Sequence, residues 1–296
     1  AGPKNLGIAL ATAEFLAFVD SDDELERGAL DAWISIARRE SADLVIAPID
    51  NAGGAPDQSP PVGRGRKSGL RGERDRLSYR SAPLGLLRRT TLGDLRFTAG
   101  LASGEDLELA TRLWFSGASI SFDPSAPAYV VHHDATDRAT SSHRTVEEDF
   151  RFMDTFEETP WFLALRRPER RAISLKIIRV HIFDAIAARL EHGTLAVDDR
   201  VALAAMLRRI VRLSPGVRGF LSMSDARALR VALAASSTAD EVHNALNARW
   251  IYGAAPTRIT ANPLLSAHRQ APYRTTAAAI RTRGAIEAAR GARSYS

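Results

Sequence analysis

The sequence predicts an α/β domain followed by an all-α region, because its two halves follow different patterns. Up to residue 50, short apolar runs alternate with amphipathic segments, which is typical of α/β domains with parallel strands. From residue 144 onward, amphipathic segments follow one another and are separated by Gly or Pro, which indicates consecutive helices. A chain of 296 residues is long enough for both regions.

The first half is predicted to contain these elements in order: a helix, a strand, a helix and a strand over residues 5–13, 14–20, 23–42 and 42–50. Both strands are short apolar runs, and the second helix repeats apolar residues at three- and four-residue spacing. Residues 51–69 are rich in Gly, Pro and Ser, so we expect a loop. A helix over 105–116 and a strand near 118–122 follow.

The second half divides into a helical domain over residues 144–252 and a basic tail over 253–296. Several of the helices begin at capping residues, as at Asp198, Ser224 and Thr238. The tail is rich in Ala, Arg and Thr with weak periodicity, so we expect it to be mobile. The α/β domain therefore covers residues 1–143.

Composition excludes several classes of function. The chain has no cysteine, which excludes disulfides, thiolate metal sites and cysteine nucleophiles and fits a cytoplasmic protein. It has no run of eighteen apolar residues that could span a membrane. Residues 144–296 hold 24 Lys+Arg against 15 Asp+Glu, a net charge of +9. The Arg-rich bias of a GC-rich genome explains this excess, or the C-terminal half contacts an anionic membrane or polymer. No motif indicates specific binding of nucleic acid.

Acidic residues follow the first predicted strand directly, at Asp20, Asp22 and Asp23. The carboxyl ends of strands in α/β sheets bind ligands, and carboxylates two residues apart can hold Mg²⁺ or Mn²⁺. The alternative is that Asp22 or Asp23 caps the helix that follows. A calcium-binding loop is excluded, because its sixth position would be Leu25 instead of glycine. A phosphatase with an aspartate nucleophile remains a third alternative.

Two motifs resemble those of family 2 glycosyltransferases, inverting enzymes with the GT-A fold. The first is GPKNLGIALATAEFLAFVDSDDELERGALDAW over residues 2–33, in which a basic-Asn-x-Gly helix leads into a strand ending in D-x-D-D. The second, SGEDLELATRLWFSGASISFDP over residues 103–124, resembles the family's Gly-Glu-Asp helix, glycine turn and strand. The resemblance covers about residues 2–143 and implies a GT-A-type mixed sheet and a hexosyltransferase-type activity that uses a nucleotide-sugar.

The resemblance also implies roles for individual residues. Asp106 would be the general base, with Glu105 beside it. Asp20 and Asp22 would bind Mn²⁺ or Mg²⁺ on the donor diphosphate, with Asp23 next to them. Donor-binding candidates are Lys4, Asn5, His132, His133 and Arg138, the last three of which fall where relatives close over the diphosphate. The alternative for Glu105 and Asp106 is that they simply begin a helix.

The resemblance implies a partner set as well. The donor would be a nucleotide-sugar and the acceptor a polysaccharide or polyol-phosphate, in the synthesis of a cell-envelope or teichoic-type polymer. The protein would be cytoplasmic, with peripheral contact at the inner face of the plasma membrane. The family's domain begins with strands that have no counterpart here, so we expect a truncated fragment with weak activity. The alternative from another class is a non-catalytic remnant that binds polyanions or membranes.

Overall fold

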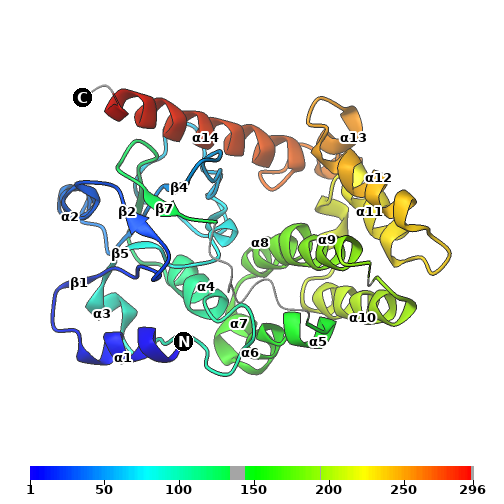
Figure 1. Cartoon of the computed structure of the whole chain (residues 1–296), viewed down its shortest axis with the longest axis horizontal. Coiled ribbons are helices and arrows are strands. Elements are labelled where there is room, and N and C mark those ends of the chain that lie inside the picture. The colour runs from blue at the N-terminus through cyan, green and yellow to red at the C-terminus, as the bar shows by residue number, and fades with distance from the viewer. Residues whose placement is uncertain (134–143, 194, 295–296) are drawn as a thin grey trace. The chain divides into compact units, whose positions relative to one another are not determined.

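The computed structural model describes residues 1–133, 144–193 and 195–294, which belong to two compact units (Figure 1). The first unit comprises Ala1–Ser142 together with Ala278–Ser296, and the second comprises His143–Ala277. The chain therefore leaves the first unit and returns to it at its C-terminal end.

The main sheet of the first unit has four strands in the order β1 (Phe15–Leu16), β5 (Gly85–Arg88), β3 (Leu44–Ile46) and β6 (Ile120–Phe122). Strand β5 is antiparallel to both β1 and β3, whereas β3 and β6 are parallel. The sheet is thus mixed, as the predicted GT-A fold class requires. Strand β5 was not predicted from the sequence, and it separates the two strands that the alternating pattern placed together.

Gly85 allows β5 to approach β3 closely. Its φ of 133° lies in the region that favours glycine, and a Cβ atom built there would lie 2.1 Å from the carbonyl oxygen of Val45. No side chain fits that space, so the pairing of these two strands requires glycine at this position.

The two faces of the main sheet are covered by different helices. Leu44 and Ile46 belong to a core that includes Leu113 of α4 (Leu107–Phe115). Val45, between them, belongs to a second core with Trp33 of α2 (Ala29–Arg39). Because side chains alternate along a strand, one three-residue strand serves both cores. Short helices α1 (Gly2–Leu10) and α3 (Arg89–Leu92) complete this part of the unit.

A smaller sheet contains β2 (Glu24–Leu25), β7 (Tyr129–Val131) and β4 (Ile49–Asn51) in that order. Strand β2 lies within the stretch that was predicted to be helical, so that prediction was wrong at its N-terminal end. Helix α2 begins only at Ala29, because Gly28 has a left-handed φ of 78° at the N-cap. Neither Asp22 nor Asp23 can therefore cap this helix.

Helix α14 (Pro272–Ser294) lies where the sequence analysis expected a mobile basic tail. Ala278, Thr282 and Ile286 are buried and recur every four residues on one face of the helix, and Ala279 is buried beside them. Arg290 forms an ion pair with Asp50 in β4 at 3.1 Å, and Arg293 forms one with Glu26 at 2.9 Å. The helix thus packs on the smaller sheet (Figure 1). Its apolar face consists mainly of small residues, which explains why the periodicity looked weak.

The second unit is largely helical, as predicted. Its described helices are α5 (Val146–Asp149), α6 (Phe152–Glu158), α7 (Pro160–Ala164), α8 (Arg167–Ile177), α9 (Phe183–Glu191), α10 (Val197–Leu213), α11 (Met223–Leu233), α12 (Ala239–Asn247) and α13 (Ala255–Arg258). A π-helical turn, Ile178–Ile182, joins α8 to α9.

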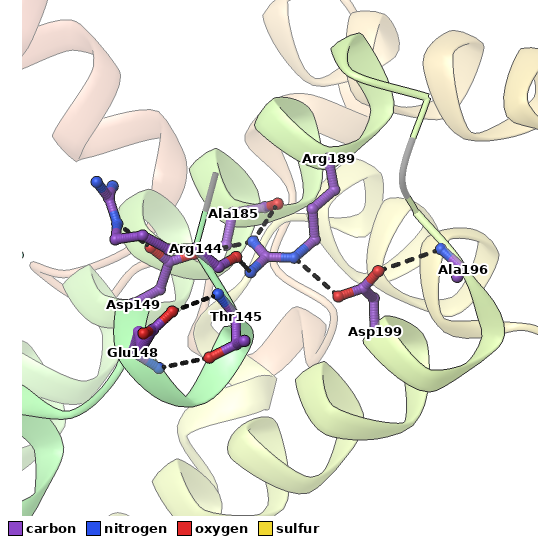
Figure 2. Close-up of polar contacts among 8 residues, drawn as sticks. All are labelled: Arg144, Thr145, Glu148, Asp149, Ala185, Arg189, Ala196 and Asp199. Atoms are coloured by element: carbon purple, nitrogen blue, oxygen red, sulfur yellow. Dashed lines mark hydrogen bonds and ion pairs between the residues drawn. The ribbon is translucent and has the colours of Figure 1, made fainter. Parts of the chain in front are cut away.

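Arg189 in α9 connects several of these helices, as Figure 2 shows. Its guanidinium donates to Asp149 of α5 at 2.9 Å and to Asp199 of α10 at 3.1 Å. It also donates to the backbone carbonyls of Ala185 and Arg144. The Arg189 side chain is only 6% exposed, and its two ion pairs with carboxylates compensate the cost of burying its charge.

Candidate functional site

Lys4 brings the two sequence motifs together. Its Nζ lies 2.8 Å from Oδ1 of Asp20, which follows β1. The same Nζ lies 3.8 Å from Oε1 of Glu105 and 3.8 Å from Oδ1 of Asp106, at the start of α4. We call these three carboxylates the acidic cluster. It joins residues that lie far apart in the sequence, one after the first strand and two before α4.

Helix α1 is held against the segment before α4, and this positions Lys4. The Asn5 side chain donates to the carbonyl of Phe97 and accepts from its backbone N–H, both at 2.9 Å. Lys4 Nζ lies 5.3 Å from the centre of the Phe97 ring, and Phe18 meets that ring edge-to-face at 4.9 Å. The Ala1 ammonium also contacts Glu105. Asn5, predicted to bind the donor, therefore acts here as an anchor for α1.

Asp106 occupies the N-cap position of α4, but its side chain makes no capping hydrogen bond. Its Oδ1 is buried and has no hydrogen-bond donor within the described part of the chain. Burial raises the pKa of Asp106 to about 6, although the nearby Lys4 opposes this effect. Glu105 and Asp20 raise the pKa further by repulsion. A buried carboxylate that titrates near neutrality is suited to take a proton.

Lys4 remains charged in this setting. Burial alone would lower its pKa, but the hydrogen bond to Asp20 and the charges of Asp106, Asp20 and Glu105 together outweigh burial and raise it. Lys4 thus places a positive charge beside the base candidate.

Asp23 is turned away from the cluster. It accepts hydrogen bonds from the Tyr129 hydroxyl at 2.8 Å and from the backbone N–H of His132 at 3.0 Å. The Tyr129 oxygen in turn accepts from the backbone N–H of Asp20 at 3.0 Å. Burial raises the pKa of Tyr129, which keeps this hydroxyl protonated as a donor. Asp23 thus fixes the turn that presents Asp20, whereas Asp22 is exposed in the same turn.

The predicted histidines lie beside the smaller sheet. His132 Nε2 is 3.2 Å from Oε1 of Glu24, and His133 Nε2 is 2.9 Å from Oδ1 of Asn51. Arg138, the third candidate of this group, lies outside the described residues.

A pocket of about 330 Å³ adjoins the acidic cluster through Lys4. Helix α1 and the segment after β1 form its walls, with Pro3, Lys4, Gly7, Ile8, Leu16, Ala17, Phe18 and Val19. Its volume is at the lower end of the range for small-molecule sites. Phe97 and Tyr129 position Lys4 and Asp20 but were not predicted as site residues, because a single aromatic residue in a loop or in a short strand produces no pattern.

Several arginines in and after the predicted loop interact with the protein itself, and of these Arg76 and Arg80 are buried whereas Arg66 and Arg74 are partly exposed. Arg66 and Arg74 both contact Asp75, whose side chain is 1% exposed. Arg76 donates to the carbonyl of Pro61, and Arg80 donates to those of Ala47 and Ser59. These side chains hold the loop in place, so they are poor candidates for recognising an anionic acceptor.

Among the described residues, no group of three or more His, Asp and Glu side chains is placed to hold a metal ion by itself. Within the same residues, no helix is long and apolar enough to cross a membrane.

Residues 1–96 match the family model described as glycosyl transferase family 2. This part of the chain belongs to glycosyl transferase family 2. The match includes Lys4, Asn5, Asp20, Asp22 and Asp23 but ends before the second motif.

One solved structure that resembles the chain is residues 1–349 of S. aureus TarS in complex with UDP-GlcNAc. The TM-score is 0.56 at 16% identity, and the match covers 83% of this chain and 70% of that one. The same TarS fragment with UDP gives a TM-score of 0.55 at 16% identity, over 86% and 71%. Another S. aureus TarS structure gives 0.56 at 15%, and the match covers 83% of this chain but only 42% of that one. These likenesses show the GT-A fold. None of the curated proteins compared matches the chain.

Proposed function

We propose that this family 2 domain transfers a sugar from a nucleotide-sugar to an acceptor hydroxyl with inversion at the anomeric carbon. The observation that carries the proposal is that the Asp20 and Asp106 carboxylates both lie within 4 Å of the same ammonium, Lys4 Nζ. A transferase of this kind needs a group at the diphosphate and a base at the acceptor, and these residues supply both.

Asp106 is the proposed general base. As the acceptor oxygen forms its bond to the anomeric carbon, Asp106 takes the hydroxyl proton, and the bond to the diphosphate oxygen breaks with its electron pair on the leaving group. The pKa of Asp106, about 6, leaves the carboxylate ionised at neutral pH and still basic enough to accept the proton. Glu105, within reach of the same Lys4, assists by its charge.

Asp20 and Asp22 are the proposed holders of Mn²⁺ or Mg²⁺. The Asp20 side chain is 41% exposed and Asp22 is exposed, so both offer oxygen ligands of the type these ions prefer. Because the described residues offer no third carboxylate or histidine at this place, the remaining ligands would come from the donor diphosphate. The ion would neutralise the charge on the leaving group. Binding of Mn²⁺ alone, followed by electron paramagnetic resonance, should weaken in Asp20→Asn.

A nucleotide-sugar donor is supported by the TarS complexes with UDP-GlcNAc and UDP. We further propose an acceptor from a cell-envelope polysaccharide or teichoic-type polyol-phosphate, and a cytoplasmic protein that contacts the inner face of the plasma membrane peripherally. These proposals rest on the resemblance to TarS and on the excess of arginine in the second half.

The decisive experiment measures UDP release from UDP-GlcNAc by the whole chain with Mn²⁺ and a polyol-phosphate acceptor. Asp106→Asn should reduce the rate by about 10³-fold, because the base is lost while the shape is kept. Asp94→Asn is the matched control, since Asp94 is an exposed aspartate of the same unit, and it should retain the parent rate. Nuclear magnetic resonance of the product should show inverted anomeric configuration.

A rate in Asp106→Asn within threefold of the parent would refute the assigned base. Absence of turnover with every nucleotide-sugar, together with intact binding of UDP, would favour a non-catalytic remnant instead.

A further inference from the structure

A groove of about 570 Å³ lies on the second unit between α10 and α11. Its apolar lining consists of Ala204, Leu207, Val211, Leu229, Leu233 and Ala234. Four arginines also line it, namely Arg208 and Arg212 from α10, Arg218 from the turn Val217–Phe220, and Arg230 from α11. No acidic side chain is among the lining residues. The groove therefore combines an apolar floor with a wholly cationic rim.

The rim arginines differ from other arginines of this unit. Arg189, Arg209 and Arg249 each meet at least one carboxylate. In contrast, the four rim side chains are exposed, and within the described ranges of the chain no hydrogen bond or ion pair engages them. Arg208 and Arg212 are even four residues apart on one helix, where like charges repel. A ligand with negative charge would relieve this repulsion.

Apolar surface continues from the groove along α10. Val201 is 59% exposed and Val197 is 57% exposed. They precede Ala204 and Arg208 at three- and four-residue spacing, so they lie on the same face of the helix. A fully hydrophilic polyanion would leave this surface in contact with water. An anionic amphiphile would cover it with its chains and place its headgroup among the arginines.

We propose that this groove binds acidic phospholipid at a membrane surface, with the phosphate between the rim arginines and an acyl chain on the apolar floor. Arginine is suited to the headgroup because its planar guanidinium can pair with phosphate oxygens bidentately. The inference does not depend on the proposed transferase activity, since it concerns other residues in the other unit.

The first test measures binding of the whole chain to vesicles of phosphatidylcholine with 30% phosphatidylglycerol (on the order of physiological acidic-lipid content). The double variant Arg208→Gln/Arg212→Gln should bind about 30-fold more weakly, because each basic residue near an anionic surface contributes roughly a fivefold gain. The control Arg151→Gln/Arg167→Gln removes the same charge from exposed sites on α8 and the start of α6. The vesicle affinity of this control should fall by less than about threefold. Equal losses in the two double variants would overturn the proposal.

The second test distinguishes a lipid from a free anion. Monomeric dihexanoyl phosphatidylglycerol should bind at least tenfold more tightly than glycerol 3-phosphate, because only the lipid has acyl chains that can occupy the apolar floor. Val211→Thr should weaken binding of the lipid and leave binding of glycerol 3-phosphate unchanged. Equal affinity for both compounds, or tight binding of soluble polyphosphate without binding to vesicles, would show that the groove recognises anions and not lipid. Unchanged melting temperatures would establish that the variants remain folded.

Discussion

Lys4 in the first unit and Lys176 in the second are both shielded from water, but their surroundings act in opposite directions. Lys4 lies among Asp20, Glu105 and Asp106, and these charges raise its pKa in spite of burial. The Lys176 side chain is 3% exposed in α8, and burial lowers its pKa to about 7, with only partial opposition from Asp184. Its Nζ lies 2.6 Å from Nε2 of His181, in the π-helical turn.

The difference shows that the number of nearby carboxylates and the depth of burial together decide whether an enclosed amine stays charged. Lys4 has three carboxylates within 4 Å. Lys176 has Asp184, which also interacts with Arg249, and His181, whose own pKa is lowered well below its usual value by burial and by Lys176. The acidic cluster thus holds a cation in place, whereas the second unit encloses an amine that loses its proton near neutrality.

Lys176→Met should produce the largest effect on stability. Because the folded pKa of Lys176 lies below its unfolded value of 10.5, the unfolded chain binds more protons between about pH 7 and 10.5. Stability should therefore rise with pH across this window in the parent. The variant should be more stable by about 3 kcal/mol at pH 7 and should lose most of this advantage at pH 10.

Urea unfolding at the two pH values measures this effect. The control is Lys176→Arg, which keeps a charge and should be less stable than the parent at both values. A Lys176→Met advantage that is independent of pH would contradict the lowered pKa.

Lys4→Met should have an intermediate effect, this time on catalysis. Since Lys4 lowers the pKa of Asp106, its removal raises that pKa above 6 and protonates the proposed base at higher pH. The acid limb of the kcat/KM profile should move to higher pH, with a loss of about fivefold at pH 6 and a smaller loss at pH 8. A loss that is equal at all pH values would show that Lys4 acts only by binding the donor.

Lys67→Met should have the smallest effect and serves as the reference for both variants. Lys67 Nζ forms an ion pair with Asp123 at 2.8 Å, but its side chain is 56% exposed. An exposed pair of this kind contributes less than about 1 kcal/mol. At pH 7 and at pH 10, the midpoint of urea unfolding of Lys67→Met should differ little from that of the parent. A change comparable to that of Lys176→Met would mean that the comparison reflects general loss of charge.

The sequence predicted the fold class of the first unit but not all of its elements, and the chemical roles of its candidate residues stay predictions. Asp20 and Asp106 were identified from the two motifs, and the structure places both beside Lys4. Strand β5 escaped prediction because GLLR is followed directly by helix α3, with no turn signal between them. The start of α2 was misplaced because Gly28 interrupts an otherwise continuous amphipathic pattern.

The groove on the second unit could not be predicted from one sequence. Its four arginines come from two helices and a turn, and each helix alone has an ordinary amphipathic pattern. The sequence indicated an excess of positive charge in this half, but internal pairing uses many of those charges, as at Arg189 in Figure 2. Only the folded arrangement separates arginines that stabilise the unit from those that are left for a partner.

The return of α14 to the first unit has a consequence for how the protein is made. The residues that cover the smaller sheet, including Ile286 and Arg290, are translated after the whole of the second unit. During translation, β4 and the segment after β2 therefore remain uncovered by α14 while the second unit is synthesised and begins to fold. A nascent chain halted before residue 278 should expose this surface to chaperones.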